Sequence, residues 1–470
     1  MAHVPLAPHT PARDEVPATS AGAAYASPEA AAAAADRLPR RLGVWSAAAV
    51  LVGSTIGSGI FRIVGGEAGV AGRVGTVGAM SLLWVLGAVV ALMGALTIAE
   101  LATMFPRSGG VYVFIREGYG PLPAFLFGWT ELLVIRPSAL GAIAVLFAEY
   151  GDKFFHYGNL GTKLVAAAAI LLLGLANIRS VRWGAAVQNL STAAKVLAIS
   201  GLAVAAFLFG HGGGAFAAPI EWSPTTWSGF GLALVSVMWA YDGWADLTFI
   251  SGEVKDPART LPRAIIGGVL AIVAIYVAVN AAYFFVLTVP QMVASKLVAA
   301  DAATAVFGAV GASVVAAMVM VSAFGALNGS MMTGPRIFFA MADDGNFFRP
   351  VAAVHPKYKT PYVAILLATA LGIAYVSFQT FEELADAFIL GIWPFYALAV
   401  GAVYILRARR PDFPRPYRTW GYPIVPAVFL LASIGMLLNA LVSDPRVTLI
   451  CFAVILAGIP VYLLWKGRGS

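Results

Sequence analysis

The 470-residue chain contains a single cysteine, Cys451, and few charged residues. One cysteine excludes an intrachain disulfide and a thiolate metal cluster. Charged residues make up 11% of the chain, whereas soluble domains average about 25%. The sequence also lacks a Walker loop, an HExxH pair and any histidine cluster with metal-ligand spacing. We therefore expect no enzymatic activity, no cofactor and no metal site.

Hydrophobic residues account for 60% of the sequence and gather in long runs. A membrane span needs about 20 apolar residues, so these runs predict an all-α integral membrane protein with twelve transmembrane helices. The expected spans are residues 44–70, 76–104, 120–150, 162–178, 185–210, 228–252, 262–288, 304–333, 361–378, 384–406, 422–441 and 446–465.

The first 36 residues differ from the rest of the chain. They are rich in alanine and proline and lack the basic start and apolar core of a signal peptide. We expect residues 1–36 to form a disordered tail and residues 37–466 to form the twelve-helix domain.

The positive charge of the chain follows its expected topology. The formal net charge is +7, and most of the 30 lysines and arginines fall in the tail and in alternate loops. Basic loops stay in the cytosol, so both termini are expected there. Because the topology accounts for the positive charge, nucleic acid is not expected as a partner. Membrane lipids are expected around the protein.

Two spans are interrupted by small and polar residues. The first contains VGSTIGSGIF (52–61), and the sixth contains WAYDGW (239–244). The two interrupted spans are each the first of their set if the first ten spans form two sets of five, at about 44–210 and 228–406, with two further helices at about 422–465. Because each set has an odd number of spans, the second set crosses the membrane in the opposite orientation to the first. Paired interruptions in corresponding spans indicate a transporter binding site.

Interrupted helices offer backbone groups to a ligand at membrane depth. The N–H groups at the start of a half-helix suit a carboxylate, and freed carbonyls suit an ammonium group. An α-amino acid carries both. A glycine-rich packing interface is the alternative for the first stretch alone, but the matching break in the sixth span favours a ligand site.

Several long segments resemble the amino acid–polyamine–organocation superfamily, and in particular bacterial members of its L-type amino acid transporter branch. The resemblance runs from about residue 40 to residue 465. Its motifs are GSTIGSGIF (53–61), PAFLFGWTELLVIRPSAL (123–140), AYDGWADLTFISGEVKDPARTLPRAI (240–265), FGALNGSMMTGPRIFFAMADDG (324–345), RPDFPRPYR (410–418) and PVY (460–462).

The resemblance implies a twelve-helix transporter with a five-plus-five inverted repeat and discontinuous helices 1 and 6, in the bacterial inner membrane. Members of this branch are sodium-independent and mostly exchange one amino acid for another by alternating access. Trp239 stands where members place an aromatic gate. Apart from the resemblance, Trp393 of the tenth span is a second gating candidate, with simple packing as the alternative. The substrate site would comprise Thr55, Ile56, Gly57, Ser58, Gly59, Trp239, Ala240, Asp242 and Gly243.

Lys195 lies in the middle of an apolar span. Its position resembles that of a lysine replacing the sodium ion of sodium-coupled relatives. We expect its ammonium group to bind freed carbonyls near Gly53 and Ser54 and to contact Ser322. The alternatives are a proton carrier and a lysine that extends to the membrane interface.

Asp242, Glu131 and Arg136 are further charged residues within predicted spans. Asp242 would recognise cationic side chains, support the loosened backbone or take part in coupling. Glu131 and Arg136 are five residues apart, so on an α-helix they share a face poorly. We expect these two to serve in structural pairing or in gating.

The expected function is therefore sodium-independent exchange of L-amino acids. A proton-coupled amino acid or polyamine carrier and a non-transporting amino acid sensor remain as alternatives. Animal relatives form a disulfide with an accessory glycoprotein through a cysteine between helices 3 and 4. Residues 151–163 contain none, so a disulfide-linked heavy chain is not expected.

Overall fold

The computed structural model describes residues 38–57, 59–67, 69–179, 181–212, 224–295, 297–443 and 445–467. The expected tail, residues 1–36, and Ser58 of the expected site lie outside the described residues. Within these ranges the regular elements are helices, apart from one isolated parallel bridge between Leu42 and Val254. The predicted all-α class is confirmed.

The helices follow the predicted spans in order. The first five spans are α2 (Val44–Thr55) with α3 (Gly59–Arg62), α5 (Val77–Met104), α7 (Pro121–Thr130) with η1 (Glu131–Ile135) and α8 (Arg136–Phe155), α9 (Gly158–Arg179), and α10 (Val181–Phe209). The next five are α11 (Pro224–Tyr241) with α12 (Asp246–Phe249), α13 (Pro257–Val286), α15 (Val298–Thr333), α17 (Tyr362–Phe378) and α18 (Phe381–Arg409). The last two are α19 (Ile424–Ser443) and α20 (Pro445–Gly467).

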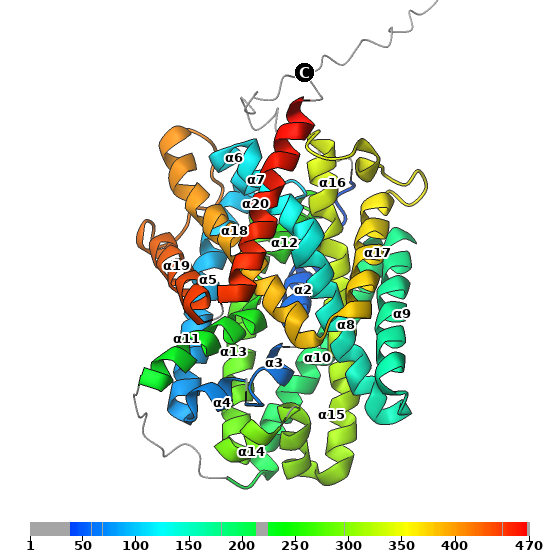
Figure 1. Cartoon of the computed structure of the whole chain (residues 1–470), viewed down its shortest axis with the longest axis vertical. Coiled ribbons are helices and arrows are strands. Elements are labelled where there is room, and N and C mark those ends of the chain that lie inside the picture. The colour runs from blue at the N-terminus through cyan, green and yellow to red at the C-terminus, as the bar shows by residue number, and fades with distance from the viewer. Residues whose placement is uncertain are drawn as a thin grey trace, which may run out of the picture.

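Six short helices lie in the connections. They are α4 (Val70–Val74), α6 (Val111–Tyr119), η3 (Ser251–Glu253), α14 (Val289–Ala294), α16 (Pro335–Asp343) and η4 (Arg349–Ala352). In Figure 1, α6 and α16 lie at the end of the molecule where α20 finishes, and α4 and α14 lie at the opposite end. The loops that follow the second and eighth spans thus share one side.

Length and composition fit a membrane protein. Among the described residues, nine helices are long and apolar enough to cross a bilayer. Three shorter apolar helices, Gly229–Tyr241, Tyr362–Phe378 and Thr448–Leu464, lie in the remaining predicted spans. Large apolar side chains on the outer helices are exposed, such as Leu172 of α9 (57%) and Leu197 of α10 (74%). Lipid would cover these faces, because exposing apolar surface to water costs about 25 cal/mol per Å².

Helix packing follows the expected repeat. The first span packs on the seventh (α2 on α13), and its counterpart, the sixth, packs on the second (α11 on α5). Likewise α10 contacts α13 and α15, whereas α18 contacts α5 and α8. Each contact made by a span of the first set thus has a counterpart made by the corresponding span of the second set. Figure 1 places α2 near the centre of the bundle, surrounded by helices of both sets.

Both predicted interruptions are present. The first span is helical to Thr55 and resumes at Gly59, and the sixth is helical to Tyr241 and resumes at Asp246. Gly243 has a φ of +109°, a conformation that glycine adopts at little cost. The discontinuous helices 1 and 6 are therefore confirmed.

The segment before α2 is bonded to the loop after η3. The N–H groups of Arg41 and Leu42 donate to the carbonyl of Glu253 at 2.8 and 2.9 Å, and the Lys255 N–H donates to the carbonyl of Leu42 at 2.8 Å. The Glu253 carboxylate pairs with Arg336 at 2.8 Å, and both side chains are 1% exposed. This buried pair ties the sixth span to α16.

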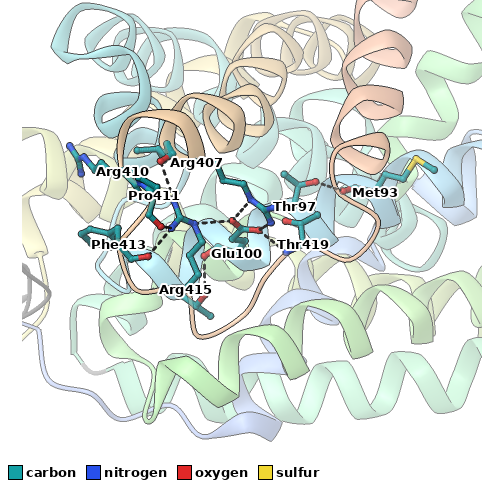
Figure 2. A network of polar contacts seen from close by, with 11 residues as sticks. Met93, Thr97, Glu100, Arg407, Arg410, Pro411, Phe413, Arg415 and Thr419 are labelled. Atoms are coloured by element: carbon teal, nitrogen blue, oxygen red, sulfur yellow. Dashed lines mark hydrogen bonds and ion pairs between the residues drawn. The ribbon is translucent and has the colours of Figure 1, made fainter.

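Glu100 of α5 forms a second buried network, shown in Figure 2. Arg407 donates to its two carboxylate oxygens at 2.9 and 2.7 Å, and the backbone N–H of Thr419 donates at 2.6 Å. Arg415 lies 3.4 Å from the same carboxylate. These contacts fix the loop between α18 and α19 against α5.

Candidate functional site

The two helix breaks face each other at close range. A Cβ atom on Gly59 would lie 2.4 Å from the Cα of Ala240, and one on Gly243 would lie 2.6 Å from the Thr55 hydroxyl. Real Cβ atoms do not approach so closely, so both positions require glycine. The small residues of the two motifs thus allow the unwound backbones to meet.

A cavity of about 40 Å³ lies at the two breaks. One water needs about 10–15 Å³ by this measure, so the space is small. The residues lining it are Ser54, Thr55, Gly57, Gly59, Arg136, Ala139, Ile143, Trp239, Asp242, Gly243, Asp246, Ala326, Ser330, Phe388 and Ile392.

Most of the expected site residues described by the structure lie at this cavity. Thr55, Gly57, Gly59, Trp239, Asp242 and Gly243 line it. Ile56 and Ala240 do not line it, but their backbone carbonyls accept hydrogen bonds beside it from Lys195 and Tyr276.

Lys195 of α10 is 1% exposed and binds three backbone carbonyls. Its Nζ donates to Gly53 O at 2.8 Å, to Ile56 O at 2.7 Å and to Ser322 O at 2.8 Å. The contacts expected with Gly53 and Ser322 are present, and Ile56 takes the place of Ser54. A neutral amine has only two hydrogens, so three donated bonds require the ammonium form.

The same face of α10 carries further donors to the first span. Gln188 and Thr192 lie two turns and one turn before Lys195, and both donate to Ala49 O, at 3.3 and 3.0 Å. Asn328 of α15 donates to Gln188 at 3.0 Å, and Asn177 of α9 donates to Asn328 at 2.9 Å. Sequence reasoning missed this buried chain of amides, which connects α2 to three neighbouring helices.

Tyr276 of α13 joins the two breaks. Its hydroxyl lies 2.9 Å from Thr55 O and 3.0 Å from Ala240 O, within donating distance of both carbonyls. The side chain is fully buried. No sequence signal distinguishes it from an ordinary core tyrosine, since its partners lie 221 and 36 residues away.

Glu131 and Arg136 form a buried ion pair, which the α-helical spacing argument did not predict. Their closest atoms are 2.5 Å apart, and their side chains are 0% and 3% exposed. The chain forms a π-helix, η1, from Glu131 to Ile135. A π-helix closes i→i+5 bonds, so residues five apart come onto one face. The expectation that they share a face poorly was therefore wrong, whereas that of structural pairing is met.

Replacing Arg136 with methionine is expected to lower the thermal stability of the protein. It would leave Glu131 as a buried, unpaired carboxylate, and breaking a buried pair costs about 3–5 kcal/mol. In the double variant Glu131→Gln/Arg136→Met no such charge remains, so we expect the unfolding midpoint in detergent to recover. Losses that simply add in the double variant would contradict this coupling.

Two further carboxylates lie at the cavity. Asp242 accepts a 2.9 Å bond from the Tyr396 hydroxyl of α18, and Asp246 lies 3.4 Å from the Thr333 hydroxyl of α15. Arg136 is close enough to act electrostatically on both. Asp246 was not among the residues expected from sequence, although it follows the WAYDGW motif by two residues.

Aromatic side chains lie around Trp239. It packs edge-to-face on Phe388 and Phe381, with ring centroids 5.0 and 6.3 Å apart. The Arg62 guanidinium lies 4.3 Å from the Phe381 ring and 2.5 Å from Glu149. This group connects the first, third, sixth and tenth spans.

Trp393, by contrast, does not line the cavity. It is 2% exposed and packs on Tyr396 and Phe429, with ring centroids 5.9 and 5.8 Å apart. Phe388 and Ile392 are the residues of α18 that reach the cavity. The geometry therefore gives no support to the expected gating role of Trp393.

Comparisons with known proteins identify the family. The amino acid permease family model matches residues 42–461. The chain is 33% identical to the serine/threonine exchanger SteT of Bacillus subtilis over 435 residues, covering 92% of this chain and 98% of that protein. It is 32% identical to the human b(0,+)-type amino acid transporter 1, covering 91% of this chain and 88% of that protein. It is 31% identical to the human cystine/glutamate transporter, covering 91% and 86%. The chain therefore belongs to the amino acid permease family, a family of membrane transporters, which confirms the resemblance drawn from its motifs.

Proposed function

We propose that this protein is a sodium-independent exchanger of L-amino acids that works by alternating access in a bacterial inner membrane. The names of the relatives support amino acids as substrates, since they include a serine/threonine exchanger and a b(0,+)-type amino acid transporter. The observation that carries sodium independence is the Lys195 ammonium group, which binds carbonyls of both α2 and α15 at 2.7–2.8 Å. A fixed cation there leaves no room for a metal ion between the first and eighth spans.

In this proposal the substrate backbone binds between the two breaks. The substrate carboxylate would bind at the first break, residues 55–59, where the N–H groups of Ile56 and Gly57 would exchange their present partners, Val52 O and Thr55 O, for it. The substrate ammonium group would bind the carbonyls of Trp239 and Ala240, which each have a second lone pair beside the bond that they already accept from Asp242 N–H or the Tyr276 hydroxyl. Gly243 lets the two backbones approach each other, and the side chain of Trp239 covers the site.

We attribute exchange to a difference between the empty and the loaded site during the change of accessible side. Backbone groups that lose their partners in a dry membrane interior cost several kcal/mol each. A bound amino acid would keep such groups of the breaks paired as the helices move, so the loaded protein would change its accessible side faster than the empty one. Outward opening would separate Arg62 from Glu149, and inward opening would separate Glu253 from Arg336.

The alternatives make different demands on Lys195 and Asp242. A proton-coupled amino acid or polyamine carrier would need one of them to release its proton during transport. The three carbonyls around Lys195 favour a permanent ammonium group, and this argues against that residue as the carrier. A non-transporting sensor would bind amino acids without moving them.

A proteoliposome experiment separates these functions. We expect uptake of labelled serine, alanine or leucine to require an amino acid inside, and to persist when choline replaces sodium. An inward proton gradient should not drive uptake into empty vesicles. Gradient-driven uptake without internal substrate would replace the exchanger by a proton-coupled carrier, and binding without flux would indicate a sensor.

Several features of the molecule complete the proposal. Residues 37–466 would form the transport domain, with residues 1–36 as a cytosolic tail and both termini in the cytosol. The protein would have no enzymatic activity. It would function without a disulfide-linked heavy chain, since residues 151–163 contain no cysteine.

A further inference from the structure

The first and seventh spans begin side by side, and backbone hydrogen bonds join the segments that precede them. Leu42, two residues before α2, forms the isolated parallel bridge with Val254, three residues before α13. The Lys255 N–H donates to Leu42 O at 2.8 Å. The Arg41 N–H donates to Glu253 O at the same distance. Because α2 then packs along α13, the starts of the two spans form one continuous surface.

This surface carries five basic residues, which we call the basic patch: Arg40, Arg41, Lys255, Arg259 and Arg263. One of the five is half-buried and the other four are exposed. Arg259 and Arg263 are four residues apart on α13, so they share one face of that helix. Two carboxylates lie in the same segments, but that of Glu253 is buried against Arg336 and only that of Asp256 is exposed. Positive charge therefore exceeds negative charge over the whole surface.

The basic patch lies where two apolar spans begin. Residues 42–61 and residues 264–295 contain no charged side chain. The hydrocarbon region of the membrane can therefore begin directly after Arg41 in the first span and after Arg263 in the seventh. Trp45, the second residue of α2, is 85% exposed, and exposed tryptophan is typical of the membrane–water interface. These positions place the basic side chains at the depth of the lipid headgroups.

Other arginines at this end of the molecule are paired with carboxylates. The pair between Glu253 and Arg336 of α16 places the patch at the end that carries α6 and α16 (Figure 1). There Arg107 and Arg116 both contact Asp344. Among the described residues the basic patch makes no ion pair, and its one side-chain hydrogen bond is a 3.5 Å contact from Arg40 to Pro106 O. Topology explains why these basic residues lie on this side, but it leaves their charge without a partner.

We propose that the basic patch binds the phosphate groups of anionic phospholipids in the adjacent membrane leaflet. Charge complementarity selects this occupant, because guanidinium groups bind phosphate through charge-assisted bonds. Clusters of about four to eight basic residues beside a span attract anionic headgroups. A lipid is favoured over a soluble phosphate, since Trp45 and two apolar helices adjoin the patch and would contact its acyl chains. A headgroup bound there would hold the starts of the first and seventh spans together.

The test measures lipid binding to the purified, full-length protein in a nonionic detergent. The probe is dioleoyl phosphatidylglycerol, and dioleoyl phosphatidylcholine, which carries no net charge, is the comparison lipid. We expect phosphatidylglycerol to raise the unfolding temperature as its concentration increases, and phosphatidylcholine to raise it much less. Glycerol phosphate should leave the unfolding temperature unchanged at the same concentrations, because it lacks acyl chains.

A triple variant assigns this effect to the patch. In Lys255→Gln/Arg259→Gln/Arg263→Gln, three exposed side chains lose their charge but remain polar. Each basic residue near an anionic membrane surface changes binding by about fivefold, so the phosphatidylglycerol concentration that gives half of the temperature rise should increase about 100-fold. Should the triple variant fail to fold, Arg259→Gln/Arg263→Gln decides, with an expected increase of about 30-fold.

The matched control is Arg349→Gln/Lys357→Gln/Lys359→Gln, which removes the same charge from three exposed residues after the eighth span. Its half-effect concentration should stay close to the native value. An equal increase in both triple variants would reveal a general charge effect and overturn the site. Equal stabilisation by the two lipids would overturn it as well, and stabilisation by glycerol phosphate would assign the patch to a soluble phosphate instead. None of these measurements involves transport, so their failure would leave the proposed exchange function intact.

Discussion

Replacing Lys195 with methionine is expected to reduce amino acid exchange by more than about 100-fold while the protein still folds and inserts. Hydrogen bonds to charged groups contribute about 1.5–3 kcal/mol each, and about 2.7 kcal/mol changes a rate 100-fold. The native ammonium group makes three such bonds and holds the first span against the eighth. Methionine keeps the unbranched chain of lysine as far as Cε but lacks the Nζ, so it leaves three buried carbonyls without a donor.

The measurement is exchange of labelled serine in proteoliposomes, with size-exclusion profiles to show that the variant folds. Lys163→Met serves as the matched control, because Lys163 also bonds a backbone carbonyl, that of Ser377 at 2.9 Å, but on the surface. Lys195→Ala should behave as Lys195→Met does. Native exchange rates in both variants would show that this lysine does not replace sodium.

The spans and the two breaks could be predicted from sequence because their signals are local. A run of about 20 apolar residues defines a span whatever its neighbours are. The stretch at residues 53–59 stands out because glycine, serine and threonine interrupt such a run. Lys195 stands out for the same reason, since charge inside a span is rare and defaults to function.

The residues that sequence reasoning missed depend on contacts between distant helices. Tyr276 and Asn328 are polar residues inside spans, but nothing near them in sequence identifies the Thr55 carbonyl or Gln188 as their partner. Structural pairing of Glu131 with Arg136 was expected, but the face that they share was missed because the argument assumed 3.6 residues per turn. The local π-helix changes that period, and it brings Arg136 to Ser330 at the cavity wall.

Trp393 illustrates a different limit of sequence reasoning. It was a gating candidate with packing as the alternative, and α18 does supply side chains to the cavity. The helix presents Phe388 and Ile392 there, and Trp393 turns toward Phe429 of α19 instead. Which face of a buried helix points inward is hard to read when both faces are apolar.

The second large effect is expected at Gly57, where leucine should abolish substrate binding. Gly57 lines the cavity between the breaks, and a Cβ atom there would already lie 3.1 Å from the Cβ of Ala326. The remaining carbons of leucine would extend into a space of about 40 Å³. They would occupy the place proposed for the substrate carboxylate.

Binding is best measured as the amino acid-induced rise in the unfolding temperature of the purified protein, which depends on ligand concentration and affinity. We expect this rise to vanish in Gly57→Leu. Gly201→Leu is the matched control, since Gly201 lies in the spanning helix α10 and a Cβ atom there would meet nothing within 4 Å. Retained affinity in Gly57→Leu would move the substrate away from the breaks. Loss in both variants would instead indicate a general effect of leucine for glycine in a span. Only loss confined to Gly57 assigns the cavity to the substrate, because the two variants make the same chemical change and differ in the space that it fills.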